Sequence, residues 1–123
     1  MKTILIVDDS ATMLMSLQGV LTKAGHKVVS AKSGEEGMTA LKSGTNPDLV
    51  ITDFNMPGMN GTEFIREVRK LPGFRFKPVL MLTTESQQEK RQEAKAAGAT
   101  GWLVKPIKPD ELIAVVKQVV PGA

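Results

Sequence analysis

The chain has 123 residues, of which 41% are apolar and 24% charged, and its net charge at pH 7 is +3. This length favours a single globular domain over residues 1–123, with a buried core and little left for a second domain. No run of about 18 apolar residues and no leader peptide is visible, and the absence of cysteine excludes disulfides and thiolate chemistry. Lys and Arg are dispersed among acids, which disfavours nucleic-acid binding. We therefore expect a soluble, cytoplasmic protein that contacts neither membrane nor nucleic acid.

Five short apolar segments run through the chain, and each gap between them is long enough to hold a helix and its turns. They lie at residues 4–7, 28–29, 49–51, 79–82 and 102–104. Short apolar runs of this kind are typical of strands buried on both faces. The chain is therefore predicted to alternate five strands with five helices.

Helix signals fall between these strands. The first predicted helix covers residues 11–24 and ends before Gly25. Its apolar stripe is formed by Met13, Leu14, Leu17 and Leu21. Ser33 and Ser86 each precede a Glu by three residues, the spacing of a capping box, which predicts helices that begin near residues 34 and 87. A last helix is predicted after Pro109.

This alternation predicts an α/β fold, in which a doubly wound, five-stranded parallel sheet carries helices on both faces. The usual strand order for such a sheet is 2-1-3-4-5. Strands 1 and 3 are then neighbours, and ligands bind outside their carboxyl ends. Asp8 and Asp9 follow the first strand, and Asp53 follows the third. The three carboxylates are therefore expected to meet in one crevice.

Three carboxylates at close range repel one another, and either a raised pKa or a bound cation relieves the repulsion. Oxygen ligands with room for water suit Mg²⁺. Capping of the first helix by Asp9 or Ser10 is the alternative explanation for a single acid at this position. Because three acids converge, we favour a magnesium site formed by Asp8, Asp9 and Asp53.

Two more strands end at the same rim with polar side chains. Thr83 ends the fourth strand and Lys105 follows the fifth. A phosphoryl group carries negative charge and acceptor oxygens that suit an ammonium group, a hydroxyl group and Mg²⁺. Lys105 alone would be an ordinary surface cation. The combination predicts a site that holds a phosphoryl group on a carboxylate.

In this order, the acid pair, the later Asp, the Thr and a Lys-Pro sequence resemble the receiver domain of two-component response regulators. The resemblance covers the whole chain and is strongest to the stand-alone, CheY-like form used in chemotaxis. It implies a flavodoxin-like fold and a signalling role rather than an enzymatic one. It also implies phosphoryl transfer from a histidine kinase to Asp53. Mg²⁺ would be held by Asp8, Asp9, Asp53 and the backbone carbonyl of Asn55.

The same resemblance implies roles for residues around the phosphoryl group. Lys105 would pair with it, and Thr83 would hydrogen-bond to it and shift towards it. The Lys105–Pro106 peptide is expected to be cis. Asn55 and Glu85 stand at the positions that tune phosphoryl lifetime.

The resemblance further implies that the face formed by helix 4, strand 5 and helix 5 switches to bind a target. Trp102 occupies the position of an aromatic switch residue, and strand alternation directs its indole towards helix 4, away from Lys105. Because no output domain follows residue 123 in the sequence, we expect action by direct binding rather than by transcription. We also expect a monomer. The target would be a flagellar motor switch or another protein.

Two alternatives remain open at this point. A haloacid-dehalogenase-like phosphatase also uses Asp, Mg²⁺, Thr and Lys, but its first strand should end in Asp-x-Asp rather than in the sequence at residues 8–10. A non-phosphorylated interaction module of the same fold would be expected to lack one of the acids, the Thr or the Lys. All of them are present.

Overall fold

The computed structural model describes residues 2–84 and 88–123 and contains five strands and five helices in strict alternation. The elements are β1 (Thr3–Val7), α1 (Ala11–Lys23), β2 (Lys27–Ala31), α2 (Gly34–Lys42), β3 (Leu49–Asp53), α3 (Gly61–Lys70), β4 (Val79–Thr83), α4 (Gln88–Ala97), β5 (Gly101–Val104) and α5 (Pro109–Val119). The predicted alternation is confirmed. No helix in the described part of the chain is long and apolar enough to cross a membrane.

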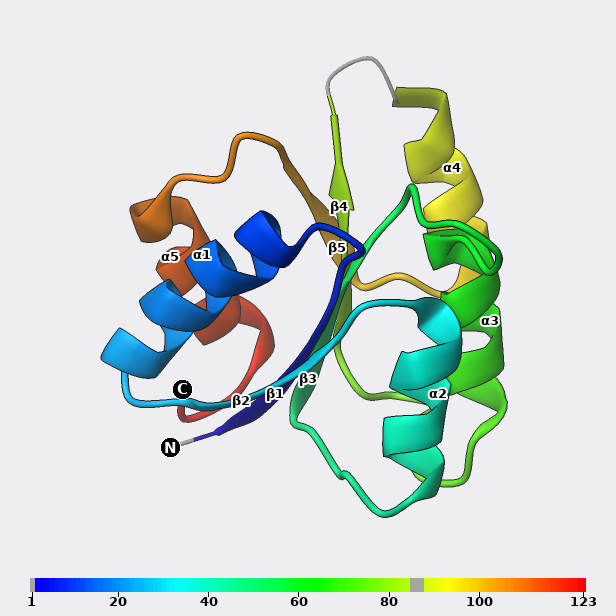
Figure 1. The fold of residues 1–123 in the computed structure, drawn as a ribbon, viewed down its shortest axis with the longest axis horizontal. Coiled ribbons are helices and arrows are strands. Elements are labelled where there is room, and N and C mark those ends of the chain that lie inside the picture. Colours follow the sequence, from blue (N-terminus) through cyan, green and yellow to red (C-terminus); the bar gives the residue numbers. More distant parts are fainter. Residues whose placement is uncertain (1, 85–87) are drawn as a thin grey trace.

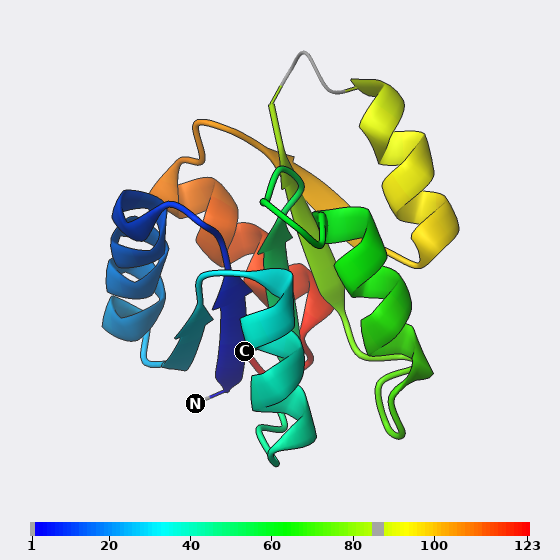
Figure 2. The same cartoon turned by 45° about the vertical axis from the view of Figure 1, so that its right-hand side comes forward.

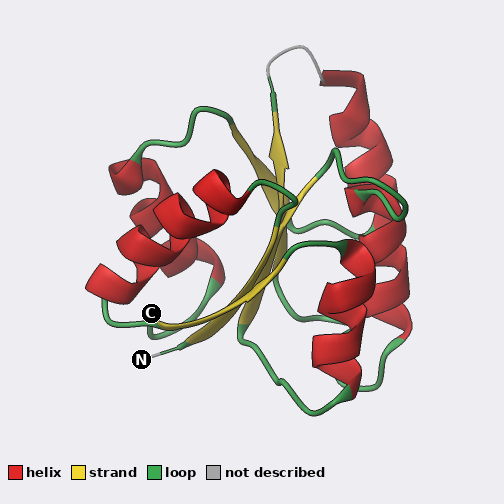
Figure 3. Cartoon of the chain, in the orientation of Figure 1, coloured by secondary structure: helices red, strands yellow, loops and turns green. Residues whose placement is uncertain are grey.

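All strand pairs are parallel and the strand order is β2-β1-β3-β4-β5, as predicted. Helices α1 and α5 cover one face of the sheet, and α2, α3 and α4 cover the other (Figures 1 and 2). Coloured by secondary structure, the sheet is a single yellow layer between two red ones (Figure 3). The fold is therefore the doubly wound, flavodoxin-like arrangement expected from the sequence.

Alternation along β1 explains why its apolar run is unbroken. Ile4 and Ile6 pack in the core cluster that includes residues of α1 and α5, whereas Leu5 and Val7 pack in the cluster on the other face. Both faces of the strand are covered by helices, so both sets of side chains are buried. An apolar residue at every position is the sequence signature of such a strand.

The helix starts agree with most of the predicted signals. Ser33 Oγ accepts a hydrogen bond from the Glu36 backbone N–H at 3.0 Å, and α5 begins at Pro109. The predicted cap at Ser86 lies outside the described residues. A reciprocal capping box that was not predicted joins Asn60 and Glu63 at the start of α3. This pair of hydrogen bonds stabilises the first turn of α3, the helix that follows the loop after Asp53.

Candidate functional site

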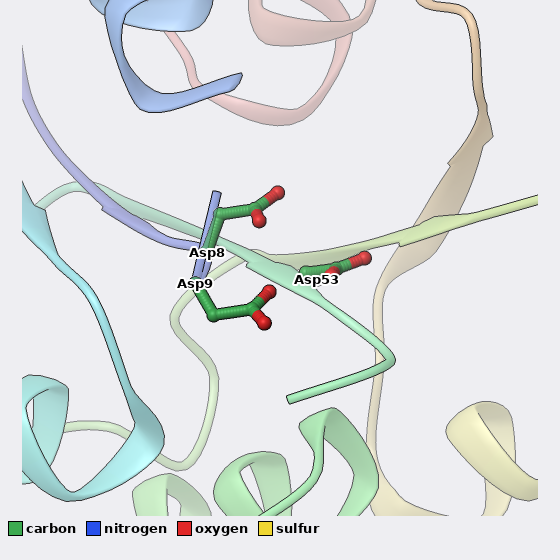
Figure 4. A group of neighbouring side chains, drawn as sticks. All are labelled: Asp8, Asp9 and Asp53. Carbon is green, nitrogen blue, oxygen red and sulfur yellow. The ribbon is translucent and has the colours of Figure 1, made fainter. Parts of the chain in front are cut away.

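Three carboxylates converge at the carboxyl edge of the sheet. Asp8 follows β1 and Asp53 ends β3, and these strands are hydrogen-bonded neighbours with Val7 opposite Thr52. Oxygens of Asp8, Asp9 and Asp53 all lie within 4.8 Å of one another. The three side chains point into the same space (Figure 4). The predicted convergence is confirmed.

The three acids differ in environment. Asp8 and Asp53 are buried, whereas Asp9 is exposed. Asp8 Oδ1 accepts a hydrogen bond from the Ser10 backbone N–H at 2.9 Å, and Ser10 Oγ accepts one from the Met13 backbone N–H at 3.2 Å. Ser10 is therefore the N-cap of α1. Helix capping accounts for Ser10 but leaves the carboxylate of Asp9 unexplained.

Lys105 follows β5 and supplies the cation of the site. Its Nζ lies 2.9 Å from Asp53 Oδ1 and 3.5 Å from Asp8 Oδ2. The Lys105 backbone N–H donates to the Thr83 carbonyl at 2.7 Å, which ties the end of β5 to the end of β4. The Lys105–Pro106 peptide is cis, as expected.

Burial and charge act in opposite directions on the titration of this cluster. Burial raises the pKa of Asp53, and the negative charge of Asp8 adds to this, while the hydrogen bond from Lys105 opposes it. Burial also disfavours the charged form of Lys105, but its contacts with Asp53 and Asp8 outweigh that effect and raise its pKa. The ammonium group therefore stays charged and compensates only part of the negative charge around it.

Thr83 ends β4 next to the acids. It is buried, and its Oγ1 has no hydrogen-bond partner among the described residues. A buried hydroxyl without a partner is costly, and most buried polar groups in proteins are satisfied. This hydroxyl is thus free to donate to a group that enters the site.

Three predicted residues lie outside the cluster of Asp8, Asp9, Asp53, Thr83 and Lys105 or outside the described part of the chain. Asn55 is exposed in the loop two residues after Asp53, and Glu85 lies outside the described residues. Trp102 is 38% exposed on β5, and the Cζ atom of Arg91 in α4 lies 5.3 Å from its ring centre. The prediction that the indole points towards helix 4 is confirmed.

One residue important for the geometry of the site was missed in the sequence. Gly61 begins α3, and its backbone N–H donates to the Phe54 carbonyl at 2.9 Å. A Cβ at this position would overlap the carbonyl oxygen of Asp53 and lie 2.9 Å from the Phe54 Cα. Only glycine lets α3 approach the backbone of Asp53 this closely. The available signal was its place directly after Asn60, at the first position of the helix that the Asn60–Glu63 spacing predicts.

The fold and this set of side chains define a receiver domain. The model of the response regulator receiver domain family matches residues 4–117, and the chain belongs to this family. Members of the family are signalling modules, and membership sets aside the haloacid-dehalogenase alternative.

Individual proteins similar to this chain include chemotaxis regulators and other receiver domains. The chain is 37% identical to the protein PilH of Pseudomonas aeruginosa over 122 residues, which cover 99% of this chain and all of PilH. The structure of the chemotaxis response regulator CheY4 of Vibrio cholerae superposes with a TM-score of 0.90 at 43% identity, and the match covers 98% of this chain and 99% of CheY4. The receiver domain of the sensor histidine kinase PA1611 of P. aeruginosa, with a magnesium ion in its active site cleft, matches at 26% identity with a TM-score of 0.85, covering 96% of each chain.

Proposed function

We propose that the chain is a single-domain response regulator whose Asp53 accepts a phosphoryl group from the phosphohistidine of a histidine kinase in a magnesium-dependent reaction. The observation that carries this proposal is the arrangement around Asp53. Two further carboxylates lie within 4.8 Å, and the Lys105 ammonium lies 2.9 Å from Asp53 Oδ1. The buried Thr83 hydroxyl without a partner stands nearby at the end of β4.

The donor set fits Mg²⁺. Oxygens bound to one Mg²⁺ at about 2.1 Å lie roughly 3 to 4 Å apart, which the carboxylates of Asp8, Asp9 and Asp53 can reach from their present spacing within 4.8 Å. The exposed position of Asp9 leaves one side open to water, which Mg²⁺ retains in protein sites. With the backbone carbonyl of Asn55, these acids would hold the ion. Bound Mg²⁺ would neutralise charge on the phosphoryl oxygens.

The chain's own residues account for the transfer step. An oxygen of the Asp53 carboxylate attacks phosphorus, the bond from phosphorus to the donor imidazole nitrogen breaks, and its electron pair remains on the imidazole. A carboxylate nucleophile needs no general base. Lys105 would move its ion pair from the Asp53 carboxylate to a phosphoryl oxygen, and Thr83 would donate its hydroxyl proton to another. Both contacts favour the phosphorylated form.

The output of this reaction would be a change of shape. We infer that Thr83 shifts towards the phosphoryl group and that Trp102 follows it, so that the face of α4, β5 and α5 gains affinity for a target protein. Asn55 and Glu85 would set how long the phosphoryl group lasts. The similarity to the chemotaxis regulator CheY4 supports a chemotaxis-type pathway, which we place in the cytoplasm, with a flagellar motor switch or a comparable protein as the target of a monomer.

Incubation with acetyl phosphate tests the proposal. With Mg²⁺, intact-mass analysis should find one added phosphoryl group, and without Mg²⁺ it should find none. Asp53→Asn keeps the shape of the side chain but removes the nucleophile, so it should abolish uptake. Labelling of this variant at the wild-type level would refute Asp53 as the acceptor. Absence of uptake by the wild-type chain would favour the non-phosphorylated interaction module.

A further inference from the structure

The loop that carries Asn55 contacts the first turn of α2. Met59 belongs to this loop, and its backbone N–H donates to Oε2 of Glu35 at 3.4 Å. Glu35 stands in the first turn of α2, 24 residues earlier in the sequence. Met38 and other residues of α2 are buried against the sheet, so the helix offers the loop a firm support.

Two glycines allow the loop and the helix to approach each other closely. A Cβ at Gly58 would lie 2.8 Å from Glu35 Oε2, and Gly58 has a φ of +75°, which other residues rarely adopt. A Cβ at Gly34, the first residue of α2, would lie 2.9 Å from Sδ of Met59. The carboxylate of Glu35 therefore rests on the loop backbone, and the thioether of Met59 rests on the helix backbone. Met59 also packs against the core cluster on this face of the sheet.

This contact falls on the part of the loop that the core holds least. Met56 is buried, so its side chain anchors the residue directly after Asn55. Residues 57 and 58 are exposed, and Asn60 begins the capping box of α3. The exposed stretch before Asn60 therefore depends on the contacts of Met59 for its position.

We propose that Glu35 is a positioning residue for Mg²⁺, because its hold on residues 58 and 59 keeps the backbone of Asn55 in place for the ion. The inference rests on the proposed function, since it takes the Asn55 carbonyl as a ligand. Mg²⁺ demands near-ideal octahedral geometry, so a displaced carbonyl ligand weakens binding. Groups that orient metal ligands commonly contribute to metal affinity. Glu35 acts through the loop and makes no bond to the ion.

Hydrogen exchange in EDTA tests the contact without metal. In Glu35→Ala the Met59 amide loses its acceptor, so amides of residues 57–60 should exchange faster than in wild type. Glu36→Ala is the matched control, because it removes the same charge from the same turn, where the side chain points about 100° away around the helix. This control should exchange as wild type does. Glu35→Gln retains an oxygen acceptor and should restore most of the protection.

Calorimetric titration with magnesium chloride measures the effect on the ion. The Kd for Mg²⁺ should rise about three- to tenfold in Glu35→Ala, the range expected for one hydrogen bond. It should stay within about twofold of wild type in Glu35→Gln and in Glu36→Ala. Recovery in Glu35→Gln separates positioning from charge, because Gln keeps the acceptor and removes the negative charge.

Two results would overturn the role of Glu35. One is a wild-type affinity for Mg²⁺ in Glu35→Ala, whether or not the loop exchanges faster. The other is an equal loss of affinity in Glu35→Ala, Glu35→Gln and Glu36→Ala, which would indicate a general effect of negative charge at the start of α2.

Phosphoryl uptake from acetyl phosphate, measured on the same preparations, separates this inference from the proposed function. Weaker Mg²⁺ binding by Glu35→Ala, with no uptake by wild type, would refute phosphoryl transfer and leave Glu35 as a positioning residue of a metal site. Uptake by wild type, with unchanged Mg²⁺ affinity in Glu35→Ala, would refute the role of Glu35 alone. Failure of the wild-type chain to bind Mg²⁺ would overturn both.

Discussion

Replacement of Asp9 by Asn should stabilise the metal-free domain. The Asp9 carboxylate lies within 4.8 Å of oxygens of Asp8 and Asp53, and it forms no ion pair among the described residues. Lys105 pairs with the other two acids. Asp9 therefore experiences repulsion that is only partly compensated. Asn keeps its size and removes its charge.

The magnitude follows from the spacing. Two unit charges 4.8 Å apart repel by about 0.9 kcal/mol in bulk water and by about 3.5 kcal/mol at an effective dielectric constant of 20. Asp9 is exposed, so the lower energy applies to its repulsion from Asp8 and to its repulsion from Asp53. The positive charge of the Lys105 ammonium offsets about one of these two repulsions. The expected gain is about 1 kcal/mol, or roughly 3 to 5 °C in Tm for a domain of this size.

Thermal unfolding in EDTA and in excess Mg²⁺ gives the assay. A ligand at a hundredfold excess over its Kd stabilises the fold by about 2.7 kcal/mol. If Asp9 helps to hold the ion, the Asn variant gains less from Mg²⁺, and the order of stability reverses between the two conditions. Glu67→Gln removes the same charge from an exposed pair with Lys70 and should shift Tm equally in both. A variant that is less stable in EDTA, or that gains from Mg²⁺ as wild type does, would refute this reasoning.

Three further substitutions test other parts of the structure. Gly61→Ala should lower the free energy of unfolding, measured in urea, by about 1 to 3 kcal/mol, because the added Cβ would meet backbone atoms. Gly19→Ala in α1 has open space around the added Cβ and should raise the free energy of unfolding by about 0.5 to 1 kcal/mol. Equal effects of the two would contradict the close approach at Gly61. Arg69→Gln should lower the free energy of unfolding by about 2 to 4 kcal/mol, because the hydrogen bonds to the carbonyls of Phe74, Lys77 and Gly98 are lost. Arg69→Lys should restore less than half of that loss. A loss below about 1 kcal/mol in the Gln variant would count against a stabilising role of these hydrogen bonds. Mg²⁺ with beryllofluoride should change Trp102 emission, yet only partly protect it from an aqueous quencher, because the indole is large for inward movement. Identical spectra and quenching in both states would make Trp102 a fixed packing residue.

The site could be predicted from the sequence because its residues stand at strand ends. In a parallel sheet all carboxyl ends share one edge, so the strand order alone brings Asp8, Asp53, Thr83 and Lys105 together. No side-chain conformation needs to be known. The same reasoning could not say that Lys105 lies closer to Asp53 than to Asp8, because that depends on its rotamer.

Some features were readable but were missed. Asn60 and Glu63 have capping-box spacing just as Ser33 and Glu36 do, and in the structure only the first pair has both reciprocal bonds. Gly61, immediately after Asn60, marked the close approach of α3 to the backbone of Asp53. Both signals lie between the third strand and the next helix, where they mark the start of α3.

The contacts of Arg69 belong to a different class, which no sequence pattern predicts. Its guanidinium group donates to backbone carbonyls in the loop between α3 and β4 and to Gly98, just after α4. Carbonyl directions depend on the folded backbone, so the acceptors carry no signal in their side chains. Burial lowers the pKa of Arg69, and its hydrogen bonds go to carbonyl oxygens instead of a carboxylate. Among the α4 residues whose burial is described, the buried ones are Ala94 and Ala97, so the Arg69 hydrogen bonds at the C-terminal end supply an anchor that these small side chains lack. At the other end, Lys90 lies 5.3 Å from the ring centre of Phe54, the residue next to Asp53. Helix α4 is thus anchored by Arg69 at its C-terminal end, and its first turn lies beside the residue that follows Asp53.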